Sequence, residues 1–223
     1  MKTMKAITLI GAMLISMLSF AQSPGFKVGT RIGVGTSDFE TSQNVYDQQV
    51  GRLVGHFGIN STYQLHRFFG IEADILLDLK GSAFNDTEGG LGGNGDYAEY
   101  YRNSYVSIPI YPKISVGSGN FFFKAYAGPS FNFLALSTRE RVYDNGNGND
   151  GPNRYSRFDK SNLGYVAGLG IEVETGGSGT YYLELRTSSD LNNVGQIENR
   201  DNGESANVSQ NFIGVSFGTK FGK

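Results

Sequence analysis

Hydrophobic and polar residues alternate along residues 69–81, which read FGIEADILLDLKG. Ile71 and Leu79 fall on one face of an extended strand, whereas Glu72 and Asp74 fall on the other. Because successive side chains of a strand point to opposite faces, this period of two predicts a strand and disfavours a helix. The segment is also close to the ~9–11 residues that a tilted strand needs to cross a membrane.

The same alternation returns seven more times along the chain. The additional strands are expected, by residue number, at 26–35, 53–65, 105–116, 120–134, 162–174, 180–188 and 208–221. Short turns are expected at 66–68, 117–119 and 176–179, and long polar loops at 36–49, 82–103, 137–160 and 189–207. Long loops that alternate with short turns indicate an up-and-down barrel inserted into a membrane from one side. We therefore predict an all-β fold, an eight-stranded antiparallel up-and-down transmembrane β-barrel.

Two prolines, Pro109 and Pro112, interrupt the strand that is expected at residues 105–116. Proline lacks the backbone N–H that a strand paired on both sides donates to its neighbour. We therefore expect a β-bulge at these two residues.

The alternation alone does not decide which row of side chains faces outward. In a soluble barrel the apolar row would fill the interior, whereas in a membrane barrel it faces lipid. The polar rows are rich in Gly, Ser and Asn, which suits the narrow interior of an eight-stranded barrel. Aromatic residues near strand ends, such as Tyr63 and Phe121, match the girdles of membrane barrels. The residues expected to face lipid are Ile71, Ile75, Leu79, Ile108, Ile110, Phe123, Leu169, Ile171, Leu183, Ile213 and Phe217.

Charges of both signs lie on the rows that would then point inward. A buried charge is costly unless it is paired, and eight strands leave room for side chains but none for a water channel. We therefore predict a plugged interior with a lumen ion network, made of Arg31, Glu72, Asp74, Asp78, Lys80, Lys113, Lys124, Glu172, Glu184 and Arg186. Glu172 and Glu184 should share a face, with Arg186 one diagonal step away to offset their repulsion.

The N-terminus has the pattern of a secretory signal peptide. Two lysines precede an apolar stretch at residues 6–20, which is shorter than the ~20 residues that a membrane helix needs. Small residues at the −3 and −1 positions predict cleavage between Ala21 and Gln22. The sequence contains no cysteine, so disulfides and a lipidated N-terminal cysteine are excluded. The expected division of the chain is a cleaved signal peptide at residues 1–21 and an outer-membrane β-barrel domain at residues 22–223.

Motifs that could carry catalysis are weak. The formal net charge of −2 offers no basic surface for nucleic acid. The sequence GVSFG at residues 214–218 matches the G-x-S-x-G elbow of hydrolases, but it lies inside an expected strand rather than at a strand-to-helix turn. Glu72 and Asp74 could form an acid–base pair, although paired charges in the lumen explain them more simply. We predict no catalytic residue and no enzyme activity.

Motifs that could hold a metal or a cofactor are also incomplete. The two histidines, His56 and His66, are expected in the lumen and in a turn, so they do not form a metal site. Residues 144–151, DNGNGNDG, resemble a calcium loop but lack its spacing and its distant Glu. Residues 90–95, GLGGNG, follow no βα unit and are expected as a loop. We predict no metal and no cofactor.

Five segments together resemble the PorT-like outer-membrane β-barrel proteins of Bacteroidetes. They are FKVGTRIGVG, FFGIEADILLDLKGS, YVSIPIYPKI, FKAYAGPSFNFL and IGVSFGTKFG, in this order along nearly the whole mature chain. The resemblance implies an outer-membrane barrel, and some members of such families are linked to secretion machinery. It implies no catalytic residues.

The sequence therefore favours an integral barrel in the outer membrane of a Gram-negative bacterium, with a structural, adhesive or secretion-associated role. Its expected partners are outer-membrane lipid and, through the extracellular loops or the secretion machinery, other proteins. Two alternatives stay open at this point. One is an outer-membrane enzyme that modifies lipid or peptide, and the other is a soluble periplasmic barrel that binds a ligand in an apolar lumen.

Overall fold

The structure is a computed structural model that describes residues 25–42, 48–86, 97–143, 150–175, 179–198 and 203–222. The expected signal peptide and its cleavage site, Ala21 and Gln22, lie outside these residues. The glycine-rich motif at 90–95 and most of the calcium-like motif at 144–151 lie outside them as well.

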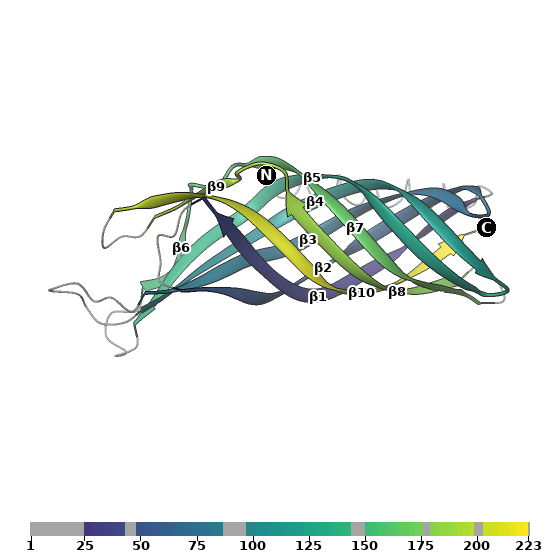
Figure 1. Cartoon of the computed structure of the whole chain (residues 1–223), viewed down its shortest axis with the longest axis horizontal. Coiled ribbons are helices and arrows are strands. Elements are labelled where there is room, and N and C mark those ends of the chain that lie inside the picture. Colours follow the sequence, from purple (N-terminus) through teal and green to yellow (C-terminus); the bar gives the residue numbers. More distant parts are fainter. Residues whose placement is uncertain are drawn as a thin grey trace, which may run out of the picture.

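Ten strands form a single antiparallel sheet (Figure 1). They are β1 (Phe26–Thr41), β2 (Gln48–His66), β3 (Phe69–Asp86), β4 (Tyr97–Ser118), β5 (Phe121–Tyr143), β6 (Asp150–Arg154), β7 (Ser161–Glu174), β8 (Gly179–Asp190), β9 (Gly195–Glu198) and β10 (Ser205–Gly222). Within the described residues, eight of them pair in the order β1-β2-β3-β4-β5-β7-β8-β10, and β10 pairs with β1 to close a barrel. The predicted eight-stranded antiparallel up-and-down barrel is therefore confirmed, with β6 added to β5 and β9 added to β10.

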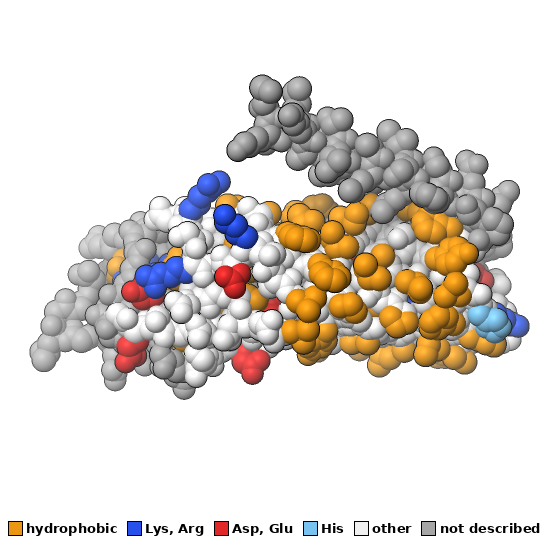
Figure 2. Space-filling view, turned by 90° about the horizontal axis from the view of Figure 1, so that it is seen from above, with side chains coloured by type: hydrophobic (Ala, Val, Ile, Leu, Met, Phe, Trp, Pro, Cys, Tyr) orange, Lys and Arg blue, Asp and Glu red, His pale blue; other side chains and the backbone are white. Residues whose placement is uncertain are grey.

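The apolar row of each strand lies on the outside of this barrel. Ile71 and Leu79 are each 43 % exposed, whereas Glu72 and Asp74 are at most 1 % exposed. Figure 2 shows the outward hydrophobic side chains gathered in a belt around one part of the barrel, with a mostly polar surface beside it. The arrangement expected of a soluble barrel, with the apolar row at the centre, is therefore wrong for this chain. The described residues contain no helix that is long and apolar enough to cross a membrane.

The expected bulge at the two prolines is not found. Strand β4 keeps one register with β3 on both sides of Pro109, from Ser107 opposite Leu76 to Ile110 opposite Ala73. Its only register shift with β5 lies at Ser104 and Tyr105 instead. Each proline therefore removes one backbone N–H donor from β4, but no extra residue is inserted into the strand.

All four segments that were expected as long loops are partly strand; within 36–49, β1 continues to Thr41 and β2 begins at Gln48. Strand β3 continues to Asp86, β4 begins at Tyr97, and β5 runs for 23 residues to Tyr143. That is about twice the ~9–11 residues that a tilted strand needs to cross a membrane. The loop predictions at 36–49, 82–103, 137–160 and 189–207 were therefore wrong in their bounds, because the barrel wall continues on the side opposite the short turns (Figure 1), beyond the exposed apolar side chains of the belt. We call this part the extension.

Strands β6 and β9 complete the wall of the extension. Strands β7 and β8 have only 14 and 12 residues and end before their neighbours. Above them, β6 pairs with β5 and β9 pairs with β10. The gap between β6 and β9 is bridged where Asp159 N–H donates to the Val194 carbonyl at 2.7 Å and Gln196 N–H donates to the Arg157 carbonyl at 3.1 Å. Backbone hydrogen bonds thus continue around the wall here.

Candidate functional site in the barrel interior

Arg31 occupies the centre of the barrel within the apolar belt. It projects inward from β1 because its neighbours in the alternation, Thr30 and Ile32, face lipid. Its guanidinium lies 2.6 Å from the Glu72 carboxylate, 2.8 Å from that of Glu184 and 3.3 Å from that of Asp74. All four side chains have no exposed surface. One cation therefore holds together carboxylates from β3 and β8, which are not neighbours of each other in the sheet.

Three lysines extend this network toward the short turns. Lys220 lies 2.5 Å from Glu72 and 2.8 Å from Glu172. Lys113 lies 3.0 Å from Glu172, and Lys124 lies 2.5 Å from Glu184 and 3.8 Å from Glu172. These lysines come from β4, β5 and β10, so the network ties the strands together across the lumen. The low polarity of such an interior strengthens each pair but makes any unpaired charge expensive.

Tyrosines fill the space between the charges. The rings of Tyr111 and Tyr126 stack with their centroids 4.3 Å apart. The Tyr111 hydroxyl donates to Asp74 at 3.0 Å, and the Tyr126 hydroxyl donates to Glu184 at 2.8 Å. The sequence reasoning gave these tyrosines no role, although strand alternation could have found them because they lie on the inward rows.

Of the ten residues predicted for the lumen network, eight meet in this cluster. They are Arg31, Glu72, Asp74, Lys113, Lys124, Glu172, Glu184 and Arg186. The other two lie in a separate layer, where Lys80 is 3.7 Å from Asp190 and Asp78 is 4.0 Å from the His56 ring.

The closest carboxylate partner of Arg186 is a different one from the two glutamates, Glu172 and Glu184. Its guanidinium pairs with Asp74 at 3.4 Å. Lys124 lies between those two glutamates instead. Lys124 projects into the lumen from β5, which pairs with β7 but is not part of the β7–β8 hairpin. The pattern within that hairpin therefore could not place Lys124.

The serine of the GVSFG motif meets a histidine inside the lumen. Ser216 Oγ lies 3.0 Å from His56 Nε2, and His56 Nδ1 lies 4.0 Å from Asp78. This order of groups is that of a serine hydrolase, but the 4.0 Å separation exceeds a hydrogen bond. Ser216 has no exposed surface, and Gly214 to Gly218 all lie in the β10 ladder, which pairs with β1 and β8. The ladder leaves no free pair of N–H groups for an oxyanion.

The described residues contain no group of three or more His, Asp or Glu placed to bind a metal ion. The lumen carboxylates instead face lysine and arginine, which compete with a cation for the same oxygens. At the end with the short turns, a polar cavity of about 310 Å³ is lined by Lys113, Glu172 and Lys220, the outermost charges of the network.

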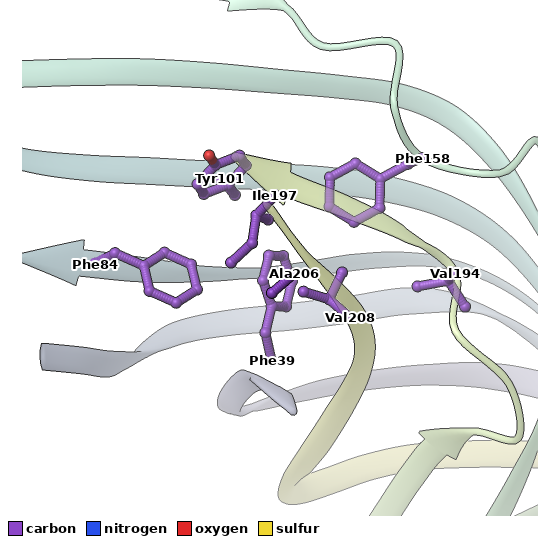
Figure 3. Close-up of a cluster of buried hydrophobic side chains, with 8 residues drawn as sticks. All are labelled: Phe39, Phe84, Tyr101, Phe158, Val194, Ile197, Ala206 and Val208. Atoms are coloured by element: carbon purple, nitrogen blue, oxygen red, sulfur yellow. The ribbon is translucent and has the colours of Figure 1, made fainter. Parts of the chain in front are cut away.

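The interior of the extension contains an apolar core. Eight buried side chains from five strands and two connecting segments pack there (Figure 3). They are Phe39, Phe84, Tyr101, Phe158, Val194, Ile197, Ala206 and Val208. We call this group the outer core. The ring of Phe39 lies 6.0 Å from that of Phe84 and 5.7 Å from that of Phe158.

A buried ion cluster adjoins the outer core. Glu99 accepts hydrogen bonds from the Nε atoms of Arg139 and Arg141, at 2.9 and 2.8 Å. The Arg141 guanidinium lies 3.9 Å from the centroid of the Tyr97 ring. Burial lowers the pKa of Arg141, but its hydrogen bond to Tyr143 and the Glu99 carboxylate outweigh burial and raise the pKa above its ordinary value.

The barrel therefore reverses its polarity along its length. On the inward face of β3, Glu72 and Asp74 give way to Phe84, while the outward face of the extension carries polar pairs such as Arg102 with Glu140 at 2.7 Å. The belt region suits lipid outside and charge inside, whereas the extension has an apolar core and a polar surface, as a protein in water does.

Comparisons with known proteins agree with this architecture. A family model described as "Outer membrane protein beta-barrel domain" matches residues 20–194. The chain is similar to the outer membrane protein OprG of Pseudomonas aeruginosa, with 12 % identity, a TM-score of 0.49, and 91 % of this chain and 98 % of that chain covered. For Neisserial surface protein A these values are 13 %, 0.42, 89 % and 97 %, and for the outer membrane protease OmpT of Escherichia coli they are 11 %, 0.37, 90 % and 99 %. Among curated proteins no match is found.

Proposed function

Because the chain belongs to the outer membrane protein β-barrel domain family and is located in the outer membrane of a Gram-negative bacterium, we propose that it is a non-conducting barrel that displays a rigid extension at the cell surface. In this role the belt region is an anchor, and the outside of the extension is an adhesive surface for extracellular partners. The chain needs no cofactor for this role.

The lumen contacts support a plugged barrel. Arg31, Lys124 and Lys220 each contact carboxylates on other strands at 2.5 to 2.8 Å, and these side chains are at most 2 % exposed. The stacked rings of Tyr111 and Tyr126 lie in the same layer. Ion passage would require these pairs to separate, and each separated charge would be left in a poorly polar interior.

The outer core is the observation that carries the adhesive role. Flexible loops do not need buried Phe and Val side chains for their function. A packed core, in contrast, holds the surface of the extension in one arrangement. A surface that is already ordered loses less conformational entropy when it binds a partner. The extension is therefore suited to binding more than to gating.

A hydrolase is the less favoured function. Ser216, His56 and Asp78 are the residues that would carry it. Ser216 and His56 are at most 4 % exposed and lie in the lumen, between the ion network and the outer core. A lipid or peptide substrate would have to displace one of these layers to reach Ser216.

Two measurements test the proposal. Purified protein in planar bilayers should show no stable single-channel conductance, and regular conductance steps would overturn the plugged barrel. Cells that display the protein should attach to a host-cell or matrix surface, and the variant Phe39→Ala/Phe84→Ala should lose attachment while it keeps its heat-dependent gel mobility. Attachment that is unchanged in this variant would overturn the role of the extension.

Export is part of the same proposal. Residues 1–21 would direct secretion and be removed between Ala21 and Gln22. N-terminal sequencing of protein purified from outer membranes tests this cleavage. The resemblance to PorT-like proteins of Bacteroidetes supports a secretion-associated role as a second possibility, which co-purification with secretion components from the native membrane would test.

A further inference from the structure

Two outward arginines lie in one row across the wall of the extension. Arg102 on β4 pairs with Thr138 on β5, and Thr138 pairs in turn with Arg154 on β6. The neighbours of Arg102 in the alternation, Tyr101 and Asn103, are buried, so Arg102 points outward. Since neighbouring strands are ~4.8 Å apart, the two arginines start about 10 Å from each other.

This row lies directly beyond the apolar belt. The row below it, one outward position closer to the short turns, pairs Leu79 with Ser104 and Ser104 with Leu136. Leu79 and Leu136 are 43 % and 44 % exposed, and no large apolar side chain beyond them on β3 or β5 is as exposed. Two residues of a strand span about 7 Å, so the arginines lie at the level where acyl chains give way to headgroups.

Arg52 adds a third cation at this level. Arg52 is the neighbour of Leu53, which is highly exposed on β2. Its side chain reaches across β3 to residues of β4. Its Nη1 donates to the Tyr101 carbonyl at 3.4 Å, and its guanidinium lies 5.4 Å from the centroid of the Tyr100 ring. Burial, and next the positive charge of Arg102, lower the pKa of Arg52.

Among the described residues, only one of the three arginines has an ion-pair partner. Arg102 pairs with Glu140 at 2.7 Å. Arg52 and Arg154 form no ion pair with any residue of the described ranges. Arg157, on the nearby connecting segment, is by contrast paired with Glu198. Within the described residues, positive charge thus exceeds paired negative charge along this row, on a chain whose formal net charge is −2.

We propose that Arg52, Arg102 and Arg154 bind phosphate groups of a phosphorylated lipid in the outer leaflet. Guanidinium groups bind phosphate through two parallel N–H···O bonds, and their spacing along the wall allows more than one phosphate to be held. The level of the row selects the source, because a lipid with its acyl chains against Leu79 and Leu136 places its headgroup at Arg102. The site goes beyond the adhesive role and does not depend on it.

The test uses the full-length mature protein in phosphatidylcholine vesicles that contain lipid A, and measures lipid binding by native mass spectrometry. Arg102→Gln and Arg154→Gln should each weaken lipid A binding about fivefold, the effect of losing one cation at an anionic membrane surface. The double variant should lose about twentyfold or more if the two sites are independent. Arg67→Gln is the matched control, because Arg67 is exposed in the short turn at the opposite end of the barrel.

The outcomes separate the alternatives. Equal weakening by Arg67→Gln would show an effect of total charge and overturn the site, as would unchanged binding in the double variant. Lipid A without its phosphates should bind no better to wild type than to the double variant. Competition by millimolar inorganic phosphate as strong as that by lipid A would assign the row to free anions and overturn the lipid. If a glutamine variant does not fold, the variant Arg102→Lys/Arg154→Lys replaces it. This variant keeps the positive charges but cannot form two parallel hydrogen bonds to one phosphate. Its affinity for lipid A should lie between that of wild type and that expected of the double glutamine variant.

Discussion

The guanidinium of Arg31 on β1 lies 2.6 Å from the carboxylate of Glu72 on β3, and neither side chain has any exposed surface. The contact spans β2, the strand between them. The hydroxyl of Thr62 on β2 also donates to Glu72, at 3.1 Å. The barrel is therefore held across its lumen as well as around its wall, and removal of either partner leaves a buried charge without its counter-ion.

Arg31→Met should destabilise the barrel strongly. The substitution leaves Glu72, Asp74 and Glu184 short of one cation in the lumen, and breaking a buried ion pair from one side typically costs about 3–5 kcal/mol. The free energy of unfolding is measured by urea titration in lipid vesicles, with gel mobility before and after boiling as the readout. The double variant Arg31→Met/Glu72→Gln should lose less than the sum of the two single variants.

Lys27→Met is the control for that experiment. Lys27 pairs with Glu174 at 2.8 Å, but their side chains are 24 % and 45 % exposed. Solvent screens such a pair, so its loss should cost about 1 kcal/mol or less. Equal losses for Arg31→Met and Lys27→Met would mean that the lumen network contributes no more than a surface pair.

Phe84→Ala should loosen the extension without releasing the anchor. Deleting a large side chain from a packed core costs about 3–5 kcal/mol through lost burial and the cavity that remains. We expect faster proteolysis of the extension on intact cells and an unchanged boiling-dependent shift on gels. Phe123→Ala, on the lipid-facing surface, is the matched control and should leave the proteolysis rate unchanged.

Ser216 should not react with a fluorophosphonate probe. Its hydroxyl has no exposed surface and touches His56, whose contact to Asp78 is 4.0 Å. Folded protein in vesicles is treated with the probe, and labelling is read by mass spectrometry against Ser216→Ala. Labelling that disappears in Ser216→Ala would establish a reactive serine and return the hydrolase to consideration.

Leu169→Arg should destabilise the barrel from the outside. Leu169 is 65 % exposed within the apolar belt, and an arginine at the middle of a membrane barrel typically costs about 2–4 kcal/mol. The unfolding titration in vesicles measures this. Glu40→Arg, on an exposed position of β1 beyond the belt, should change stability by about 0.5 kcal/mol or less. A larger loss for Glu40→Arg than for Leu169→Arg would contradict the level assigned to the belt.

Alternation in the sequence was enough to predict the barrel and the side on which residues such as Ile71 and Glu72 lie. It could do so because lipid outside and charge inside impose opposite chemistry on successive residues. It could not predict that Lys124, more than Arg186, separates Glu172 from Glu184. Contacts across a lumen depend on how the sheet closes, which a pattern within one hairpin does not contain.

The extension was missed for a related physical reason. Beyond Lys80 the inward row of β3 changes from charged to apolar at Phe84, while the outward row loses its large apolar residues. The alternation with a period of two persists, but the inward side chains become apolar and the two rows differ less in polarity. Residues 82–103 were therefore predicted to be a loop. On β4, Glu99 and Tyr101 carry one charged and one aromatic side chain to the same interior, which weakens the pattern further.

The reversal of polarity also gives membrane insertion a direction. Phe39, Phe84 and Phe158 pack inside the extension, whose outer surface is polar. A polar surface needs water rather than lipid, so these rings should pack together only after their segments have crossed the membrane. Once assembled, these rings are buried in the outer core. Withdrawal of the chain would expose these rings to water, which costs free energy, so the packed outer core should oppose reversal of insertion.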